Sequence, residues 1–396
     1  MTPFVYQEEL AKQGLALLLA HHIVYFAMEE RTGKTLTAIR VAEQHHATKV
    51  LVITKKKALK GWEDTLAAYK TNKPFEVTTY SQLHKIDPKQ RQLVILDEPH
   101  AYVSGYPKPG VTWKLTRVLT TQADIIYLSA TPYAQGPQLL YHQFALSSFS
   151  PWAKFSNFYA WFKMYGKPHS IYVKGIEIPQ YTKCDTELAL SGVDHLFITK
   201  TRKELGFEHE PEDVVHWLEL DEVTKHVYNT LVKKRLVQLK AGTLACESVA
   251  KLRASLHMLE GGCAKIGDAY IILANDEKIR FILSKWGDTD DMVIMYYYIA
   301  EGVKLRQVFK NAEVLQADSF AEGVDLSGYK HLIIYSQAFS TAKHSQRRAR
   351  QANINRAEEI LVHFLLVNKA ISHQVYKAVS VNKVNYIDAL YEGTTL

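Results

Sequence analysis

Short, nearly continuous apolar runs recur along the first half of this 396-residue chain, and they constrain its fold more than any other feature. Five of them are IVYFAM (23–28), VLVIT (50–54), FEVTTY (75–80), LVILDE (93–98) and IIYLSAT (125–131). Runs of this kind are typical of parallel strands that are buried on both faces. Residues 35–46 and 59–69 have helical patterns, which completes β-α-β units. The first half therefore predicts a parallel α/β sheet.

The same alternation returns in the second half. Its apolar runs are MVIMYYY (292–298), HLIIYS (331–336) and ILVHFLLV (360–367). Helical patterns over 300–310 and 342–352 separate them, whereas residues 133–250 are more helical and mixed. A chain of this length has room for two to three domains. We expect one α/β domain over residues 1–215 and a second over residues 216–396.

Composition restricts the class of protein. Hydrophobic residues make up 47% of the chain and charged residues 22%, which is an ordinary globular profile. No apolar run reaches the roughly 18 residues that suggest a membrane span, and the first residues lack the basic start of a secretory signal. Cys184, Cys246 and Cys263 are widely spaced, which favours a reducing cytoplasm over a disulfide framework. The net charge of +7 suits a polyanionic partner without requiring one.

Two segments allow a nucleic-acid interpretation beside a simpler one. Residues 150–168 (SPWAKFSNFYAWFKMYGKP) place aromatic side chains at helical spacing: Trp152, Phe155, Phe158, Tyr159 and Phe162. Such a stripe can stack bases, but it is more often core, and we favour packing. Three lysines of this segment could still contact a backbone: Lys154, Lys163 and Lys167. Residues 222–240 predict a basic amphipathic helix with a solvated charged face.

The stretch MEERTGKTLTAI (28–39) joins the first predicted strand to a helix. A phosphate-binding loop has a glycine five residues before Gly33, where this chain has Met28, so a plain turn remains open. In a phosphate loop, Lys34 would reach the β- and γ-phosphates and the Thr35 hydroxyl would bind Mg²⁺. Backbone N–H groups at the helix start would hold the phosphates. The candidate nucleotide-binding loop consists of Arg31, Thr32, Gly33, Lys34 and Thr35.

Two further strand ends carry the polar groups that phosphoryl transfer needs. In LVILDEPH (93–100), Asp97 would bind Mg²⁺ and Glu98 would polarise the attacking water; a plain strand exit is the alternative. In LSATP (128–132), small polar residues suit a strand end that senses the γ-phosphate. We expect His100 to couple the ATP site to the other domain.

The series Gly-Lys-Thr, Asp-Glu-x-His and Ser-Ala-Thr resembles motifs I, II and III of superfamily 2 helicases. AEGVDL (321–326) resembles motif V, and QRRARQANINR (346–356) resembles motif VI. Shorter matches are similar to the Swi/Snf-type branch: FVYQ (4–7), VITKKKALKGW (52–62), TTYSQL (78–83), LFITKTRKEL (196–205) and ISHQVYKAV (371–379). The matches cover nearly the whole chain in the family's order, and its compact size resembles phage-encoded members.

This resemblance implies an α/β fold with two RecA-like parallel-sheet lobes in tandem and a helical, aromatic-rich segment between them. ATP and Mg²⁺ would bind in the cleft between the lobes. The first lobe would contribute Gln7, which reads adenine, with Gly33, Lys34, Thr35, Asp97 and Glu98. The second lobe would contribute Gly323, Asp325, Gln346, Arg347 and Arg350. The first-lobe DNA contacts would be Thr54, Lys55, Thr79 and Tyr80.

The chain departs from the family pattern in two motifs. In motif I, Arg31 stands where the family often has glycine. In motif VI, Ala349 replaces the usual glycine and Asn353 stands at the final arginine position. We therefore assign the arginine finger to Arg350 with support from Arg347, and Arg356 could substitute.

The function that the resemblance implies is an ATP-driven DNA motor, either a helicase or a double-strand translocase. We expect duplex or branched DNA as its partner, with a role in branch migration or fork remodelling during phage replication and recombination. We expect a monomer in the cytoplasm, which would be the host cytoplasm for a phage protein. An RNA helicase and a DNA-binding regulatory protein with weak ATPase activity remain as alternatives. A metal-dependent nuclease is disfavoured, because DEPH is the one cluster of acids and histidine found.

Overall fold

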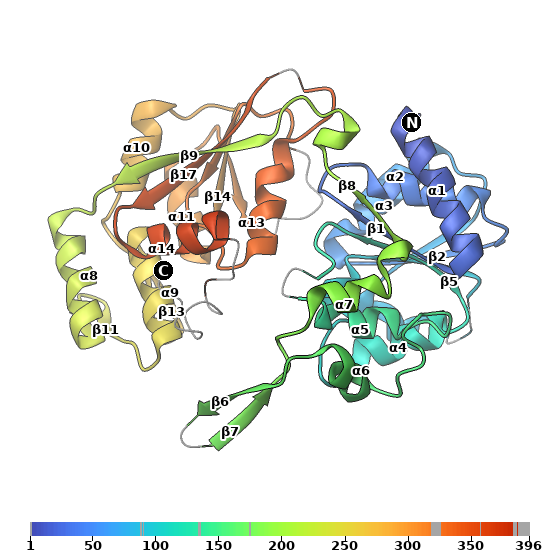
Figure 1. The fold of residues 1–396 in the computed structure, drawn as a ribbon. Coiled ribbons are helices and arrows are strands. Elements are labelled where there is room, and N and C mark those ends of the chain that lie inside the picture. The colour runs from blue at the N-terminus through green and yellow to red at the C-terminus, as the bar shows by residue number, and fades with distance from the viewer. Residues whose placement is uncertain are drawn as a thin grey trace. The chain divides into compact units, whose positions relative to one another are not determined.

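The computed structural model describes residues 2–87, 89, 91–133, 136–173, 176–317, 326–356, 358–382 and 386. The chain divides into two compact units, Met1–Gly206 and Phe207–Leu396 (Figure 1). Each unit is built around one parallel sheet. The predicted α/β fold class, two RecA-like parallel-sheet lobes in tandem, is confirmed.

The first unit holds a six-stranded sheet in the order β3-β2-β4-β5-β1-β8. Its strands are β1 (Ile23–Met28), β2 (Val50–Thr54), β3 (Phe75–Thr79), β4 (Leu93–Asp97), β5 (Asp124–Ser129) and β8 (Phe197–Lys200). All neighbouring strands pair in parallel. The five apolar runs of the first half therefore form the strands that the sequence predicts. Since the strands are parallel, the residues that follow β1, β4 and β5 lie at one edge of the sheet.

Helices cover the first sheet on both faces because its strands are apolar on both faces. The helices are α1 (Val5–His21), α2 (Lys34–Gln44), α3 (Leu59–Tyr69) and α4 (Val111–Thr120). Tyr25 of β1 points into a core of aromatic residues and stacks on Tyr127 with ring centroids 5.1 Å apart. The next residue, Phe26, points to the opposite face. There a Cβ added to Gly14 of α1 would lie 2.4 Å from the Phe26 ring.

The aromatic-rich segment packs into the first unit. It contains α5 (Gln138–Phe144), α6 (Phe158–Tyr165) and α7 (Thr186–Ser191). Trp152, Phe158 and Phe162 are buried in the core of this unit, so the packing interpretation is confirmed for them. Tyr159 differs, since 45% of it is exposed. The segment also forms a hairpin that the sequence analysis missed, β6 (His169–Val173) and β7 (Ile176–Gln180).

The second unit holds a five-stranded parallel sheet in the order β15-β14-β16-β17-β9. Its strands are β9 (Pro211–Leu218), β14 (Met292–Tyr296), β15 (Glu313–Gln316), β16 (His331–Ile334) and β17 (Ile360–Val367). Three of them correspond to the three predicted apolar runs. Strand β9 pairs with β17 along its whole length. The division of the chain therefore falls before β9, whereas the boundary expected after residue 215 lies inside this strand.

The helices of the second unit are α8 (Glu222–Lys234), α9 (Val249–Glu260), α10 (Glu277–Lys285), α11 (Ile299–Val308), α13 (Thr341–Arg348) and α14 (Ile371–Tyr376). Two short hairpins accompany them: β10 (Leu236–Leu239) with β11 (Gly242–Ala245), and β12 (Cys263–Ile266) with β13 (Ala269–Ile272). Among the described residues, no helix combines the length and apolarity needed to cross a membrane.

The helix predicted over residues 222–240 is wrong in its last part. The helix α8 stops at Lys234, because Arg235 adopts a left-handed conformation with φ of 57°. The next four residues form β10, in which alternate side chains face opposite sides and Val237 is buried in a hydrophobic cluster. After Arg235 the side chains alternate with the period of two that a strand has. The sequence analysis interpreted Leu236–Leu239 as helix because so short a stretch fits both periods.

The close approach of α1 to β1 gives a test of packing. Gly14→Ala should lower the free energy of unfolding by about 1–2 kcal/mol, since the added methyl group meets the fully buried Phe26 ring. Gly61→Ala in α3 is the matched control: nothing lies within 4 Å of its added Cβ. This control should gain about 0.5–1 kcal/mol from helix propensity. Urea denaturation compares the two, and equal effects of both substitutions would contradict the packing.

Candidate nucleotide-binding site

The loop between β1 and α2 requires a glycine at its last position. Gly33 is the N-cap of α2 and has φ of 77°, a left-handed conformation. A Cβ at this position would lie 2.1 Å from the side-chain nitrogen of Gln7. Arg31 also has a positive φ, 67°, a conformation that glycine adopts more readily than other residues. The Thr32 hydroxyl donates to the carbonyl of Glu29 at 2.7 Å and fastens the loop onto itself.

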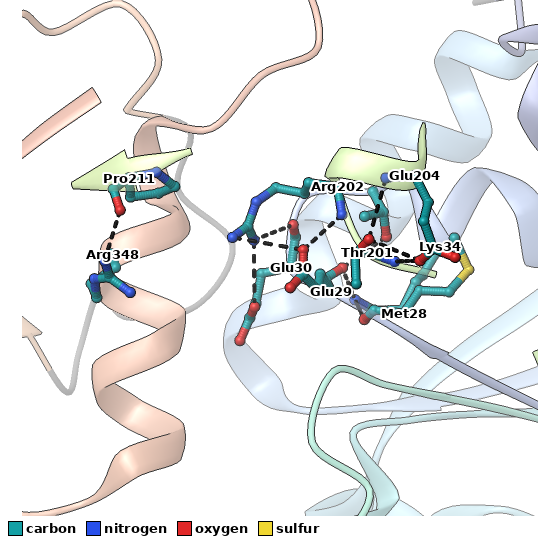
Figure 2. Close-up of polar contacts among 10 residues, drawn as sticks. Met28, Glu29, Glu30, Lys34, Thr201, Arg202, Glu204, Pro211 and Arg348 are labelled. Atoms are coloured by element: carbon teal, nitrogen blue, oxygen red, sulfur yellow. Dashed lines mark hydrogen bonds and ion pairs between the residues drawn. The ribbon is translucent and has the colours of Figure 1, made fainter. Parts of the chain in front are cut away.

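Lys34 extends back along this loop, as Figure 2 shows. Its Nζ donates to the carbonyl oxygens of Met28 and Glu29, each at 2.8 Å. Burial lowers the pKa of the Lys34 ammonium, and the carboxylates of Glu98, Glu30 and Asp97 oppose that shift. Carbonyl oxygens are neutral, so the charged oxygens of a phosphate would be stronger partners for this ammonium.

The first turn of α2 suits an anion. Its N–H groups begin at Lys34, and no acidic residue lies in this turn. A helix start with free N–H groups and no acidic residue in its first turn is a common phosphate-binding arrangement. Thr35 lies in the same turn and is half-buried.

Asp97, the last residue of β4, is held from two sides. Its Oδ2 accepts a hydrogen bond from the Thr54 hydroxyl at 2.6 Å and from the Trp62 indole nitrogen at 3.0 Å. Such outer partners fix the orientation of a metal-binding carboxylate. The carboxylate of Asp97 and the hydroxyl of Thr35 are oxygen donors of the kind that Mg²⁺ prefers. The residues present therefore fit a magnesium ion.

Glu98 follows Asp97 in a left-handed conformation, with φ of 50°. Its backbone N–H donates to the carbonyl of Leu128 at 2.8 Å, which ties it to β5. The Ser129 hydroxyl donates to Glu98 Oε2 at 3.1 Å, and His100 Nδ1 lies 3.2 Å from the same oxygen. Ser129 and His100 also contact each other at 2.9 Å. The Asp-Glu-x-His and Ser-Ala-Thr segments therefore meet around the Glu98 carboxyl group.

The environment of Glu98 changes its acidity. The pKa of its carboxyl group is raised to about 7, first by burial and then by the charge of Asp97. Lys55, Lys34 and the hydrogen bond from Ser129 act in the opposite direction. A carboxyl group with a pKa near neutrality can accept a proton from water and release it within one reaction cycle.

Arg202 neutralises part of the charge of the two acids of the loop, Glu29 and Glu30. The sequence analysis did not predict this role. Its backbone N–H donates to the Glu29 carboxylate at 2.7 Å, and its guanidinium lies 3.7 Å from Glu29 and 3.8 Å from Glu30 (Figure 2). Arg202 follows β8, the edge strand beside β1. Two carboxylates next to a phosphate site would repel the ligand, and a buried arginine reduces that repulsion. The one sequence signal for this role was the segment LFITKTRKEL (196–205), which contains Arg202 and resembles a segment of the Swi/Snf-type branch.

The structure places Gln7 beside the loop. Its side-chain nitrogen donates to the carbonyl of Gly33 at 3.3 Å, and its oxygen accepts the Phe4 N–H at 2.9 Å. Both ends of the amide therefore support the loop and the start of α1. Recognition of adenine by Gln7 stays a prediction.

The residues expected to contact DNA in the first unit are mostly buried. Thr54 is fully buried and bonded to Asp97, while Thr79 and Tyr80 are 5% and 3% exposed. Only Lys55 of these four residues has substantial exposed surface. Three of them lie at the ends of β2 and β3, within the core, and contact of these four residues with DNA stays a prediction.

In the second unit, the candidate arginines differ in their surroundings. Arg347 is 2% exposed, with its guanidinium 5.8 Å from the centre of the Tyr297 ring, and Arg350 is 7% exposed. The Arg356 guanidinium donates to the carbonyls of Ser327 at 2.9 Å and Glu358 at 3.2 Å. These bonds give Arg356 a structural role. Outside the described residues lie Gly323, Asp325 and the side chain of Gln346.

Comparison with known proteins gives only remote likenesses. No protein-family model matches the sequence, and no curated protein matches it. Among solved structures, the chain is similar to the SWI2/SNF2 ATPase core of Sulfolobus solfataricus in complex with double-stranded DNA. That likeness has a TM-score of 0.46 and 13% identity, over 99% of this chain and 94% of the other. The SWI2/SNF2 ATPase core domain of the same organism gives a TM-score of 0.43 and 13% identity, over 99% and 90%.

The surroundings of Glu98 predict its titration. An NMR titration can follow Glu98 when glutamate is labelled with ¹³C at the carboxyl carbon and Glu98→Gln is used to assign the signal. Glu98 should titrate near pH 7. Ser129→Ala should move this midpoint to higher pH, because the substitution removes a hydrogen bond that stabilises the charged carboxylate. Ser148→Ala, which removes an exposed serine of the same unit, should leave the midpoint unchanged. A midpoint near the ordinary value of about 4.3 would show that the carboxyl group is solvated.

Proposed function

We propose that this protein is an ATP-driven motor on DNA, acting as a helicase or a double-strand translocase. One observation carries the proposal: Lys34, Asp97 and Glu98 gather at one edge of the first sheet, and their charges influence one another. These are the residue types that bind the phosphates, hold magnesium and activate water in phosphoryl transfer. The resemblance of the motif series to superfamily 2 supports the same function.

The chemistry divides among residues of the first unit. Lys34 and the N–H groups of α2 would bind the β- and γ-phosphates of ATP, as the free helix start suggests. Thr35 and Asp97 would hold Mg²⁺, which when bound neutralises charge on the phosphates. Ionised Glu98 would take a proton from the attacking water, held in place by Ser129 and His100. We further propose that Arg350, supported by Arg347, stabilises charge on the γ-phosphate in the transition state.

The proposed partner is duplex or branched DNA, with contacts mainly to phosphate, so that binding tolerates sequence and weakens with salt. The specific role that we propose is branch migration or fork remodelling during phage replication and recombination. A second candidate is a DNA-binding regulatory protein with weak ATPase activity. It is favoured by Met28 in place of the loop glycine and by the burial of both Arg347 and Arg350. An RNA helicase differs only in the nucleic acid that stimulates it.

The test of this function is an ATPase assay with no nucleic acid, single-stranded DNA, duplex DNA, a four-way junction and RNA. Duplex or branched DNA should raise turnover most. Lys34→Ala should abolish turnover by removing the charge on the phosphates. Glu98→Gln should still bind ATP, with a rate lower by about 10²–10⁴-fold, because an amide cannot accept the proton. Unchanged turnover in Lys34→Ala would refute the site, and stimulation by RNA alone would select the RNA helicase.

The arginines are tested separately. Arg350→Ala should lower kcat far more than ATP affinity, by on the order of 10³-fold or more, because an arginine finger acts only in the transition state. Arg347→Ala should have a smaller effect, and the double change should exceed both. Arg356→Ala is the structural control: it should lower the melting temperature and leave kcat close to normal, since its guanidinium bonds carbonyl groups. If none of these changes affects turnover, the regulatory protein becomes the better explanation.

A further inference from the structure

A pocket of about 390 Å³ lies in the first unit between α4, α5 and the residues that lead into α6. Figure 1 labels these three helices in one region of the unit. The described residues that line the pocket fall within 107–117 and 141–159, and none of them belongs to the candidate nucleotide-binding site. Small-molecule sites typically have volumes of roughly 300–1,000 Å³. The pocket is therefore large enough for a ligand of its own.

Aromatic side chains form the walls of this pocket. The Trp113 indole nitrogen donates to the backbone carbonyl of His142 at 2.6 Å, which joins α4 to α5. The Phe158 ring stacks on the His142 ring, with centroids 6.0 Å apart and an interplanar angle of 22°. Tyr159, the exposed member of the aromatic stripe, also lines the pocket. Rings with exposed faces bind another flat ring by stacking.

The wall also contains a buried hydrogen-bond acceptor. His142 is 3% exposed, and burial lowers the pKa of its imidazole to about 4, so the ring is neutral at pH 7. A hydrogen bond to the backbone of Gly105 opposes this shift, whereas Nδ1 has no partner among the described residues. The bonded nitrogen is therefore Nε2, which carries the proton, and Nδ1 presents a lone pair. An N–H group of a ligand would satisfy this buried atom.

The rim of the pocket is positive. Lys108 and Arg117 line it and are exposed, and none of its described lining residues is acidic. The Arg117 guanidinium lies 5.1 Å from the centre of the Trp113 ring, so a cation stands directly beside the aromatic wall. Over residues 99–168 the sequence has six lysines and arginines and one acid, Asp124. This charge suits an anionic ligand.

The aromatic walls, the lone pair and the cations together match one chemistry, a nucleobase joined to its phosphate. We propose that this pocket binds one nucleotide unit, with the base against the aromatic walls and the phosphate beside Lys108 and Arg117. The exocyclic amine of an adenine donates to His142 Nδ1. The unit comes either from a free mononucleotide or from an unpaired base of a strand, since base stacking on aromatic side chains serves both. The inference does not depend on the proposed motor, because the pocket uses none of the residues assigned to ATP hydrolysis.

The experiment is ¹⁹F NMR of the full chain labelled with 5-fluorotryptophan, which gives a signal for each of the six tryptophans. Trp113 and Trp152 line the pocket, whereas Trp62 donates to Asp97 and reports on the ATP site. Substitution of each tryptophan by phenylalanine assigns the signals. The probes are dAMP, its analogue without the exocyclic amine, a short oligodeoxyadenylate and, separately, a non-hydrolysable ATP analogue with Mg²⁺.

In the wild-type protein, dAMP should shift the signals of Trp113 and Trp152 and leave those of Trp217 and Trp286, in the second unit, unchanged. It should bind about fivefold more tightly than the analogue without the amine, because one hydrogen bond changes Kd by about this factor. His142→Phe keeps a ring at this position and should remove the difference between the two nucleotides. Its melting temperature shows whether the unit stays folded, and the comparison of the two nucleotides on the wild type does not need this variant.

The phosphate contacts are tested by the double change Lys108→Gln and Arg117→Gln. It should weaken binding of dAMP about tenfold, since each exposed ion pair contributes a few-fold. Lys114→Gln is the matched control, because Lys114 is an exposed lysine of α4 that does not line the pocket. This control should bind dAMP like the wild type.

The probes also separate the two sources of the ligand. A strand should bind more tightly than dAMP and lose this advantage as salt rises, whereas equal affinities identify a free mononucleotide. The proposal is overturned if neither probe shifts Trp113 and Trp152, or if the wild type binds dAMP and the analogue without the amine equally well. Failure of the motor has a different signature: the ATP analogue leaves the Trp62 signal unchanged while the pocket signals still respond to dAMP.

Discussion

The charge balance around Lys34 is the interaction on which the site depends. One ammonium lies near the carboxylates of Asp97, Glu98 and Glu30, and burial opposes its charge. The parallel sheet creates this situation, because it brings the ends of β1 and β4 to one edge. Removing the ammonium would leave these carboxylates with less compensation, which is unfavourable at partly buried positions. Phosphate and magnesium together would supply both a new partner for the ammonium and a cation for the carboxylates.

A set of neutral donors and one arginine keeps these charges in position. Thr54 and Trp62 hold Asp97, and Ser129 holds Glu98. Arg202 binds the acids of the loop, so the phosphate site has less negative charge of its own. Thr54, at the end of β2, is therefore buried and uses its hydroxyl to hold Asp97.

The sequence predicted the two sheets and the residues that gather around Lys34, because apolar runs and short motifs are local signals. It failed where the determining contact joins distant residues. The ion pair of Arg202 with Glu29 joins residues that are 173 positions apart in the sequence, so it leaves no local pattern. The strand β10 was predicted as part of a helix, since a stretch as short as Leu236–Leu239 cannot distinguish the helical period from the strand period. Burial of Thr79 and Tyr80 depends on the packing around β3, which motif similarity does not reveal.

The central claim is that the loop before α2 binds the phosphates of ATP through Lys34. The most direct measurement is a crystal structure of the full chain with Mg²⁺ and a non-hydrolysable ATP analogue. The account predicts that Lys34 Nζ leaves the carbonyls of Met28 and Glu29 and contacts the β- and γ-phosphates, with the metal bound by Thr35 and Asp97. A structure in which Lys34 keeps both carbonyls while the nucleotide binds elsewhere would contradict it.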